Sequence, residues 1–165
     1  MKIFSYKKFK HGFTLIEVLI ACTIISTSTF ALMSASTKGI QLSAQALRQT
    51  QANMLLEEGA EAVKSIRDAS WTNISGLTLD TNYYLTFNTG TNTWSLGTTA
   101  TPSIDSIFTR TVVVSAVNRD ANDDIAVSGT VDTRTKKVTV TTSWTLADAT
   151  TSSKTLAFYM SDIFN

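Results

Sequence analysis

The sequence has very few of the residues that build catalytic and metal centres. It contains one histidine, His11, and one cysteine, Cys22. Beyond His11 the chain therefore cannot form a His-based triad, a Cys–His dyad or a His-ligated zinc site. A single cysteine also excludes an intramolecular disulfide. Because no phosphate loop or dinucleotide fingerprint is present either, the sequence predicts that the protein is not an enzyme.

Charge and helix breakers are missing from one long stretch. Residues 13–37 contain no glycine and no proline, and Glu17 is their only charged side chain. As a helix, this stretch would extend about 37 Å, which is enough to cross a hydrocarbon core of ~30 Å. Lys7, Lys8 and Lys10 lie just before it, so the positive-inside rule places the N-terminus in the cytoplasm. We predict a single membrane-spanning helix, with the rest of the chain outside the membrane.

Glu17 is unexpected in such a helix, because a carboxylate near the bilayer centre costs about 2.5–3.5 kcal/mol. In a cleaved secretory signal the apolar run would be shorter and uncharged. In a simple membrane anchor the acid would be a liability without a purpose. A position at the headgroup boundary is a further interpretation, because Glu17 lies only about 6 Å along the helix from Phe13. None of these interpretations accounts for Gly12, which precedes the apolar run.

The segment KHGFTLIEVLIA, Lys10 to Ala21, resembles the processing signal of type IV prepilins and type II secretion pseudopilins. The resemblance implies that a prepilin peptidase cuts after Gly12 and N-methylates Phe13. It also implies that Glu17 neutralises the terminal amine of a neighbouring subunit in a filament. The implied partners are other pilin-like subunits, the peptidase (which is also the methyltransferase) and an inner-membrane assembly platform. The protein would lie in the inner membrane before assembly, and in a cell-surface or periplasmic filament afterwards.

Helical periodicity continues beyond the membrane segment. The only helix breaker between Ile40 and Asp68 is Gly59. A helical glycine costs about 1 kcal/mol relative to alanine, and we expect close packing against a sheet to compensate for it. We predict one helix from Phe13 to about Ala69, with an amphipathic second half. The residues expected near one face are Ile40, Ala44, Leu47, Gln51, Leu55, Ala62 and Ile66, with Leu56 and Val63 beside them.

After Trp71 the apolar residues alternate, which is typical of strands. Strands are expected at residues 83–88, 93–96, 108–116, 138–146 and 154–160. Residues 89–92 are expected to form a hairpin turn, and residues 131–137 another turn. The fold class is α+β, with one long helix packed on an antiparallel sheet, as the pilin resemblance implies. The predicted divisions are a leader at 1–12, a membrane or filament-core helix at 13–37, its amphipathic second half at 38–70 and a sheet-containing head at 71–165.

The head offers a few candidate ligand sites. Asp120, Asn122 and Asp124 have the D-x-N-x-D spacing that begins a calcium loop. Ile125 and Val131 stand where that loop needs a glycine and a glutamate, so a polar turn without a metal is the alternative. Trp94, near the predicted hairpin tip, is a candidate sugar platform. No cofactor other than calcium is expected.

A nucleic-acid partner is disfavoured. Arg134, Lys136 and Lys137 form a short basic run, but four of the chain's lysines precede Gly12. Without those four, the chain has 10 basic and 13 acidic side chains, which is not the charge of a nucleic-acid-binding domain. We predict a structural subunit of a type IV pilus-like filament, with a minor pilin favoured. The alternatives are a type II secretion pseudopilin and a membrane-anchored binding module whose helix is only a tether.

Overall fold

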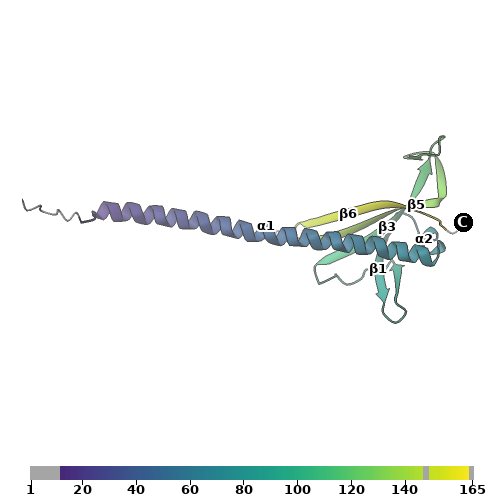
Figure 1. Ribbon diagram of the computed structural model, residues 1–165, viewed down its shortest axis with the longest axis horizontal. Helices are drawn as coiled ribbons and strands as arrows, with labels where there is room; N and C mark the ends of the chain where they lie inside the picture. The colour runs from purple at the N-terminus through teal and green to yellow at the C-terminus, as the bar shows by residue number, and fades with distance from the viewer. Residues whose placement is uncertain (1–11, 147–148, 164–165) are drawn as a thin grey trace, which may run out of the picture. The chain divides into compact units, whose positions relative to one another are not determined.

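The computed structural model describes residues 12–146 and 149–163. The chain divides into two compact units, one up to Ala46 and one from Leu47 onward. The helix α1 (Leu15–Ala69) contributes to both, and a short helix α2 (Thr72–Ser75) follows it (Figure 1). The strands are β1 (Asn82–Asn88), β2 (Thr93–Gly97), β3 (Phe108–Arg119), β4 (Ile125–Ala126), β5 (Thr130–Thr145) and β6 (Thr151–Ser161). The architecture is α+β and pilin-like, as predicted.

The first unit is the N-terminal part of α1, and its side chains are exposed. The helix begins at Leu15, two residues after the predicted start, and an apolar window in it has a mean hydropathy of 2.0. No residue of that window is buried, and the helix is long and apolar enough to cross a membrane. Phe13, Leu15 and Phe30 are 86%, 79% and 74% exposed. Burial within the chain therefore does not explain this apolar composition.

Hydroxyl groups in this part of α1 bond back to the helix itself. Six serine and threonine side chains donate to the carbonyl oxygen three or four residues earlier, at 2.7–3.0 Å. These bonds leave the hydroxyls with a partner inside the helix, so the polar side chains do not require water. The donors are Thr23, Ser26, Thr27, Ser28, Thr29 and Thr37.

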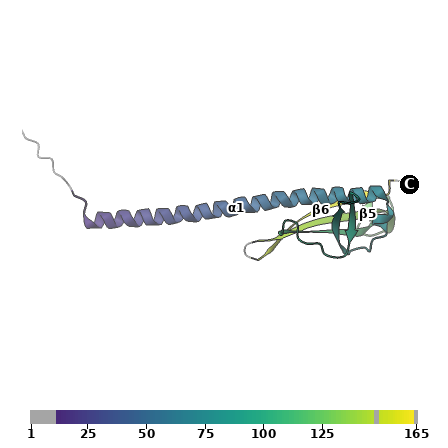
Figure 2. The same ribbon diagram turned by 90° about the horizontal axis from the view of Figure 1, so that it is seen from below.

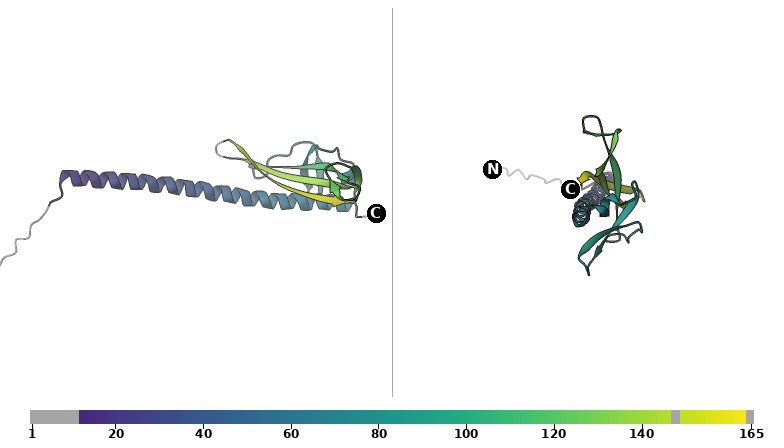
Figure 3. Two further views of the ribbon diagram at one scale, coloured as in Figure 1. Left: turned by 90° about the horizontal axis from the view of Figure 1, so that it is seen from above. Right: turned by 90° about the vertical axis from the view of Figure 1, so that its right-hand side faces the viewer.

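The second unit contains an antiparallel sheet with the strand order β2-β1-β3-β5-β6, and β4 pairs with the end of β3. The β3–β5 and β5–β6 ladders are long, whereas β1 pairs with β3 only at Asn82 and Tyr83. Figure 2 shows the sheet along one side of the second half of α1. The β1–β2 hairpin and the β4 region extend in opposite directions from the sheet (Figure 3). The hairpin turn at residues 89–92 lies where it was predicted.

The core forms between α1 and the inner face of the sheet. On the helix, burial begins at Ala52 and continues at Leu56, Gly59 and Val63. A β-carbon built on Gly59 would lie 2.9 Å from Val140 Cγ1, so the helix approaches the sheet at the glycine, as expected. The predicted apolar face is confirmed in this half of the helix. Ile40 and Leu47, at the earlier positions of that face, are 72% and 60% exposed within the chain.

Arg110 joins the helix to the sheet beside Gly59. It extends from β3 and is only 6% exposed. Its Nη1 donates to the Leu55 carbonyl of α1 at 3.0 Å and lies 3.4 Å from a carboxylate oxygen of Glu58. The guanidinium also lies 5.6 Å from the ring centre of Trp94. Trp94 is therefore half-buried and packed against the core, whereas the sequence suggested a sugar platform.

The predicted turn at residues 131–137 is wrong, because these residues belong to β5. Val117 pairs with Asp132, whereas the preceding residue, Ala116, pairs with Lys136. Residues 133–135 therefore form an irregularity within a continuing strand rather than the end of a strand. Such bulges increase the local twist of the sheet. Beyond the bulge, the sheet continues as residues 117–132, in which the end of β3 pairs with β4 and with the start of β5. The charged and hydroxyl side chains at residues 132–135 are typical of both turns and bulges.

Candidate functional site

The predicted cleavage point lies just before α1. Gly12 and Phe13 have no regular secondary structure. Both are exposed, and no atom lies within 4 Å of the position that a β-carbon on Gly12 would occupy. A protease needs an accessible, non-helical peptide bond, and the bond between these two residues has that geometry.

Thr14 and Glu17 cap the beginning of α1. Glu17 Oε2 accepts hydrogen bonds from the backbone N–H and the hydroxyl of Thr14, both at 3.1 Å. The Glu17 N–H in turn lies 3.4 Å from Thr14 Oγ1. This reciprocal arrangement is a capping box, which gives partners to backbone N–H groups that a helix start leaves without an acceptor. The box fixes the position of the carboxylate four residues after Phe13.

The capping role of Glu17 was missed in the sequence, although the signal is present. Thr-x-x-Glu before an apolar run is the pattern of a capping box. The Glu17 side chain remains exposed within the chain, so its carboxylate is accessible to a cation from outside. Its negative charge also lies at the positive end of the helix dipole, which stabilises it there.

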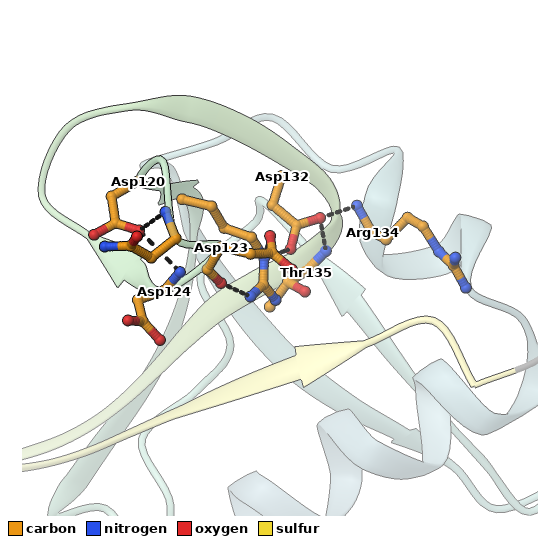
Figure 4. Close-up of polar contacts among 8 residues, drawn as sticks. Asp120, Asp123, Asp124, Asp132, Arg134 and Thr135 are labelled. Carbon is orange, nitrogen blue, oxygen red and sulfur yellow. Dashed lines mark hydrogen bonds and ion pairs between the residues drawn. The ribbon is translucent and has the colours of Figure 1, made fainter.

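The candidate calcium residues lie in the loop between β3 and β4. Asp120 Oδ1 accepts hydrogen bonds from the backbone N–H groups of Asn122 and Asp124, at 2.8 and 3.0 Å (Figure 4). The backbone also closes the loop, because the Asp120 N–H donates to the Asp124 carbonyl at 2.9 Å. Asp120 is therefore a turn-forming residue. In the described part of the chain, no group of three His, Cys, Asp or Glu side chains is placed to hold a metal.

Calcium binding stays a prediction that a titration can test. If Asp120, Asn122 and Asp124 bind the ion, millimolar calcium will raise the melting temperature of the wild-type protein. The Asp124→Ala variant is the informative one, because only the backbone of that residue contributes to the turn. It should abolish the calcium-dependent shift and leave the calcium-free melting temperature nearly unchanged. Equal melting temperatures with calcium and with a chelator would reject the site.

Asp132 and Arg119 form an ion pair across β3 and β5 that the sequence did not reveal. Arg119 Nε lies 2.7 Å from Asp132 Oδ2, and its Nη1 donates to the Asp123 carbonyl at 2.7 Å. Asp132 Oδ1 accepts from the N–H groups of Arg134 and Thr135, at 2.8 and 3.1 Å (Figure 4). The Arg119 guanidinium, helped by these N–H donors, holds the pKa of the Asp132 carboxyl well below its ordinary value.

This pair predicts a pH-dependent stability. Because the pKa of Asp132 is lower in the folded chain than its ordinary value of 3.8, the ionised carboxylate stabilises the fold above that pH. The contribution decreases as the pH falls and the group becomes protonated. Wild-type protein should therefore be more stable than Asp132→Asn at pH 7, and the difference should shrink below about pH 4. Urea denaturation of both proteins at pH 7 and below about pH 4 measures this difference in the free energy of unfolding. A difference that does not change with pH would contradict the prediction.

The basic run does not form one surface. Lys136 is buried at 8% exposure on the inner face of β5, whereas Lys137, the next residue of the strand, is exposed. Successive strand residues point to opposite faces, so these two charges cannot bind the same phosphate chain. The Arg134 side chain points away from the carboxylate that its backbone binds (Figure 4).

One comparison with known proteins identifies the N-terminal segment. The family model described as the prokaryotic N-terminal methylation motif matches residues 7–33. Searches of curated proteins and of solved structures found no match. The matched range includes the Gly12–Phe13 bond and the capping box. The chain therefore carries the methylation motif that is the signal of type IV pilins and pseudopilins.

Proposed function

We propose that this protein is a structural subunit of a type IV pilus-like filament. It is made as a prepilin, cleaved after Gly12, N-methylated at Phe13 and assembled through the apolar part of α1. A minor pilin is the favoured identity, and a type II secretion pseudopilin is the alternative. The observation that carries the proposal is the methylation motif, which spans residues 7–33 and so includes the start of an exposed apolar helix.

The exposed side chains of α1 support a filament role. Residues 15–33 include many large apolar side chains that are between 51% and 79% exposed, among them Leu19 and Ile20. A continuous surface of this kind is stable only against lipid or other apolar side chains. A membrane covers it in the monomer, and the helices of neighbouring subunits cover it in a filament.

The proposed route sets the order of partners. The subunit first lies in the inner membrane with its N-terminus in the cytoplasm, where the peptidase removes the basic leader. An assembly platform then moves the helix into the filament. Glu17 pairs there with the methylated amine of a neighbouring Phe13, which is an ion pair that can set the register of stacked helices.

The first experiment is mass spectrometry of the N-terminus of protein isolated from its native host. We expect the chain to begin at N-methylated Phe13, because the Gly12–Phe13 bond is accessible and lies inside the matched motif. The matched control is a Gly12→Val chain, in which a β-branched residue occupies the cleavage point. That chain should keep its leader. A wild-type chain that begins at Met1 beside an active peptidase would overturn the proposal.

Shearing separates the two filament types. A pilin is released from the cell surface into the sheared fraction, whereas a pseudopilin stays in the cell envelope. Immunoblots of the sheared and the envelope fractions give the ratio of this protein in the two. A periplasmic marker in the same blots detects cell lysis. A predominantly sheared signal supports the pilus, and a predominantly envelope-bound signal supports the secretion pseudopilin.

A further inference from the structure

A polar pocket lies in the second unit of the chain. Its volume is about 420 Å³, which is within the range of small-ligand sites. Six of its lining residues carry hydroxyl groups, and no Asp or Glu of residues 12–146 and 149–163 lines it. The hydroxyl-bearing residues are Ser103, Ser106, Thr109, Ser143, Thr145 and Thr151, and the others are Arg48, Ile107 and Trp144.

Arg48 provides the only charge in this lining. Its Nη1 donates to the Thr145 carbonyl at 3.2 Å, which ties the guanidinium to the end of β5. Among residues 12–146 and 149–163, no carboxylate forms an ion pair with Arg48. A guanidinium has five N–H donors, so one bond to a carbonyl leaves most of its donors available to a ligand. Arg48 is half-buried, where its charge is less screened than on an open surface.

The loop at one side of the pocket is held in an unusual conformation. The N–H of Ile104 donates to the Phe108 carbonyl at 2.7 Å, and the Phe108 N–H donates back at 2.9 Å. Between them, Asp105 and Ser106 have φ angles of 51° and 58°, in the left-handed region that L-residues seldom adopt. Ser106 lines the pocket, so this closed loop fixes one wall.

We propose that this pocket binds a small organic oxyanion, a carboxylate or a phosphate carried by a sugar-sized molecule. The class follows from the lining, because a guanidinium that has no carboxylate partner among the described residues suits a carboxylate or phosphate in bidentate geometry. Serine and threonine hydroxyls can donate to the anion and to ligand hydroxyl groups. A pocket without carboxylates does not repel a negative charge. The site shares no residue with the cleavage and assembly positions.

The test is calorimetric titration of the full chain in detergent at constant ionic strength. The probes are glucuronate and glucose 1-phosphate, with uncharged glucose as the comparison. We expect saturable binding of both anions and none of glucose, and the tighter of the two anions identifies the preferred group. Trp144 fluorescence gives a second reading, because this residue lines the pocket. No saturable binding up to about 10 mM, or equal binding of glucose and glucuronate, would overturn the proposal.

Three variants locate the binding. Arg48→Gln should weaken the anions at least about tenfold, whereas Arg134→Gln removes the same charge outside the pocket and should leave binding unchanged. Thr109→Val replaces one lining hydroxyl by a methyl group without touching Arg48, and it should also weaken binding. If Arg48→Gln fails to fold, the Thr109→Val result decides. Binding that is unchanged in Thr109→Val and, where it folds, in Arg48→Gln would contradict the site.

Discussion

Replacing Glu17 by leucine is expected to lower the incorporation of the subunit into filaments by about a hundredfold or more, because an unpaired buried charge costs about 3–5 kcal/mol. In the proposed filament the amine of a neighbouring Phe13 would lose its only counter-charge. The measurement is an immunoblot of sheared and cell-associated fractions. Processing at Gly12 should continue, since the change lies beyond the cleaved bond.

Two further variants separate the charge of Glu17 from its capping role. Glu17→Gln keeps a side chain that can complete the box with Thr14, but it removes the charge. Thr14→Ala keeps the charge and weakens the helix start by about 1 kcal/mol. If the charge of Glu17 is required, Glu17→Gln should lower incorporation into filaments nearly as much as Glu17→Leu does. Thr14→Ala should still assemble. If Glu17→Gln assembles normally, the capping role of Glu17 matters and its charge does not. If Glu17→Leu also assembles normally, α1 serves only as a membrane tether and not as an assembly helix.

Enlarging Gly59 is expected to give the largest loss of stability in the head. In Gly59→Ala the new methyl group would lie 2.9 Å from Val140 Cγ1 and 3.0 Å from Arg110 Cδ. Val140 is fully buried and Arg110 is tied to Leu55 and Glu58, so neither side chain can move freely. Overpacking costs about 1–3 kcal/mol, whereas the alanine gains at most about 1 kcal/mol of helix propensity. We therefore expect a net destabilisation, and a larger one for Gly59→Leu.

Gly39 provides the matched control, because it lies in the same helix and a β-carbon added to it would have no atom within 4 Å. Denaturation followed by tryptophan fluorescence reports on the head alone, since the three tryptophans lie at residues 71, 94 and 144. Gly39→Ala should leave the free energy of unfolding unchanged or slightly higher. A Gly59→Ala chain as stable as the control would mean that helix and sheet can separate slightly at little cost.

Much of this architecture could be predicted because its signals are local. The apolar run predicted the start of α1 to within two residues, and period-two alternation predicted the strands around Val112 and Val140. Gly59 could also be interpreted, because a glycine in an otherwise uninterrupted helix needs a reason, and close packing is the common one. Trp144 alternates with apolar residues in the same way, and it is 3% exposed.

The errors arose where distant segments decide the outcome. Leu47 continues the helical periodicity, but within the second unit the burial of α1 begins only at Ala52. Beside the bulge in β5, Asp132 pairs with Arg119, which lies thirteen residues earlier in the chain. Alternation within β5 gives no indication of that pairing. Arg110 alternates with apolar residues that face inward, so its position in β3 is one of burial. The acceptors that allow a buried guanidinium, the Leu55 carbonyl and the Glu58 carboxylate, come from α1 and not from the strand.

The hydroxyl groups that bond back along α1 affect how the helix changes surroundings. A side chain that depended on water or on a neighbouring helix would lose that bond whenever the helix moved. Thr23, Ser26 and Ser28 instead carry their acceptors with them, on the preceding turn. In the proposed assembly route, the exchange of lipid for packed protein would therefore need no new partner for these groups. The segment therefore keeps an apolar outer surface although it contains several serines and threonines.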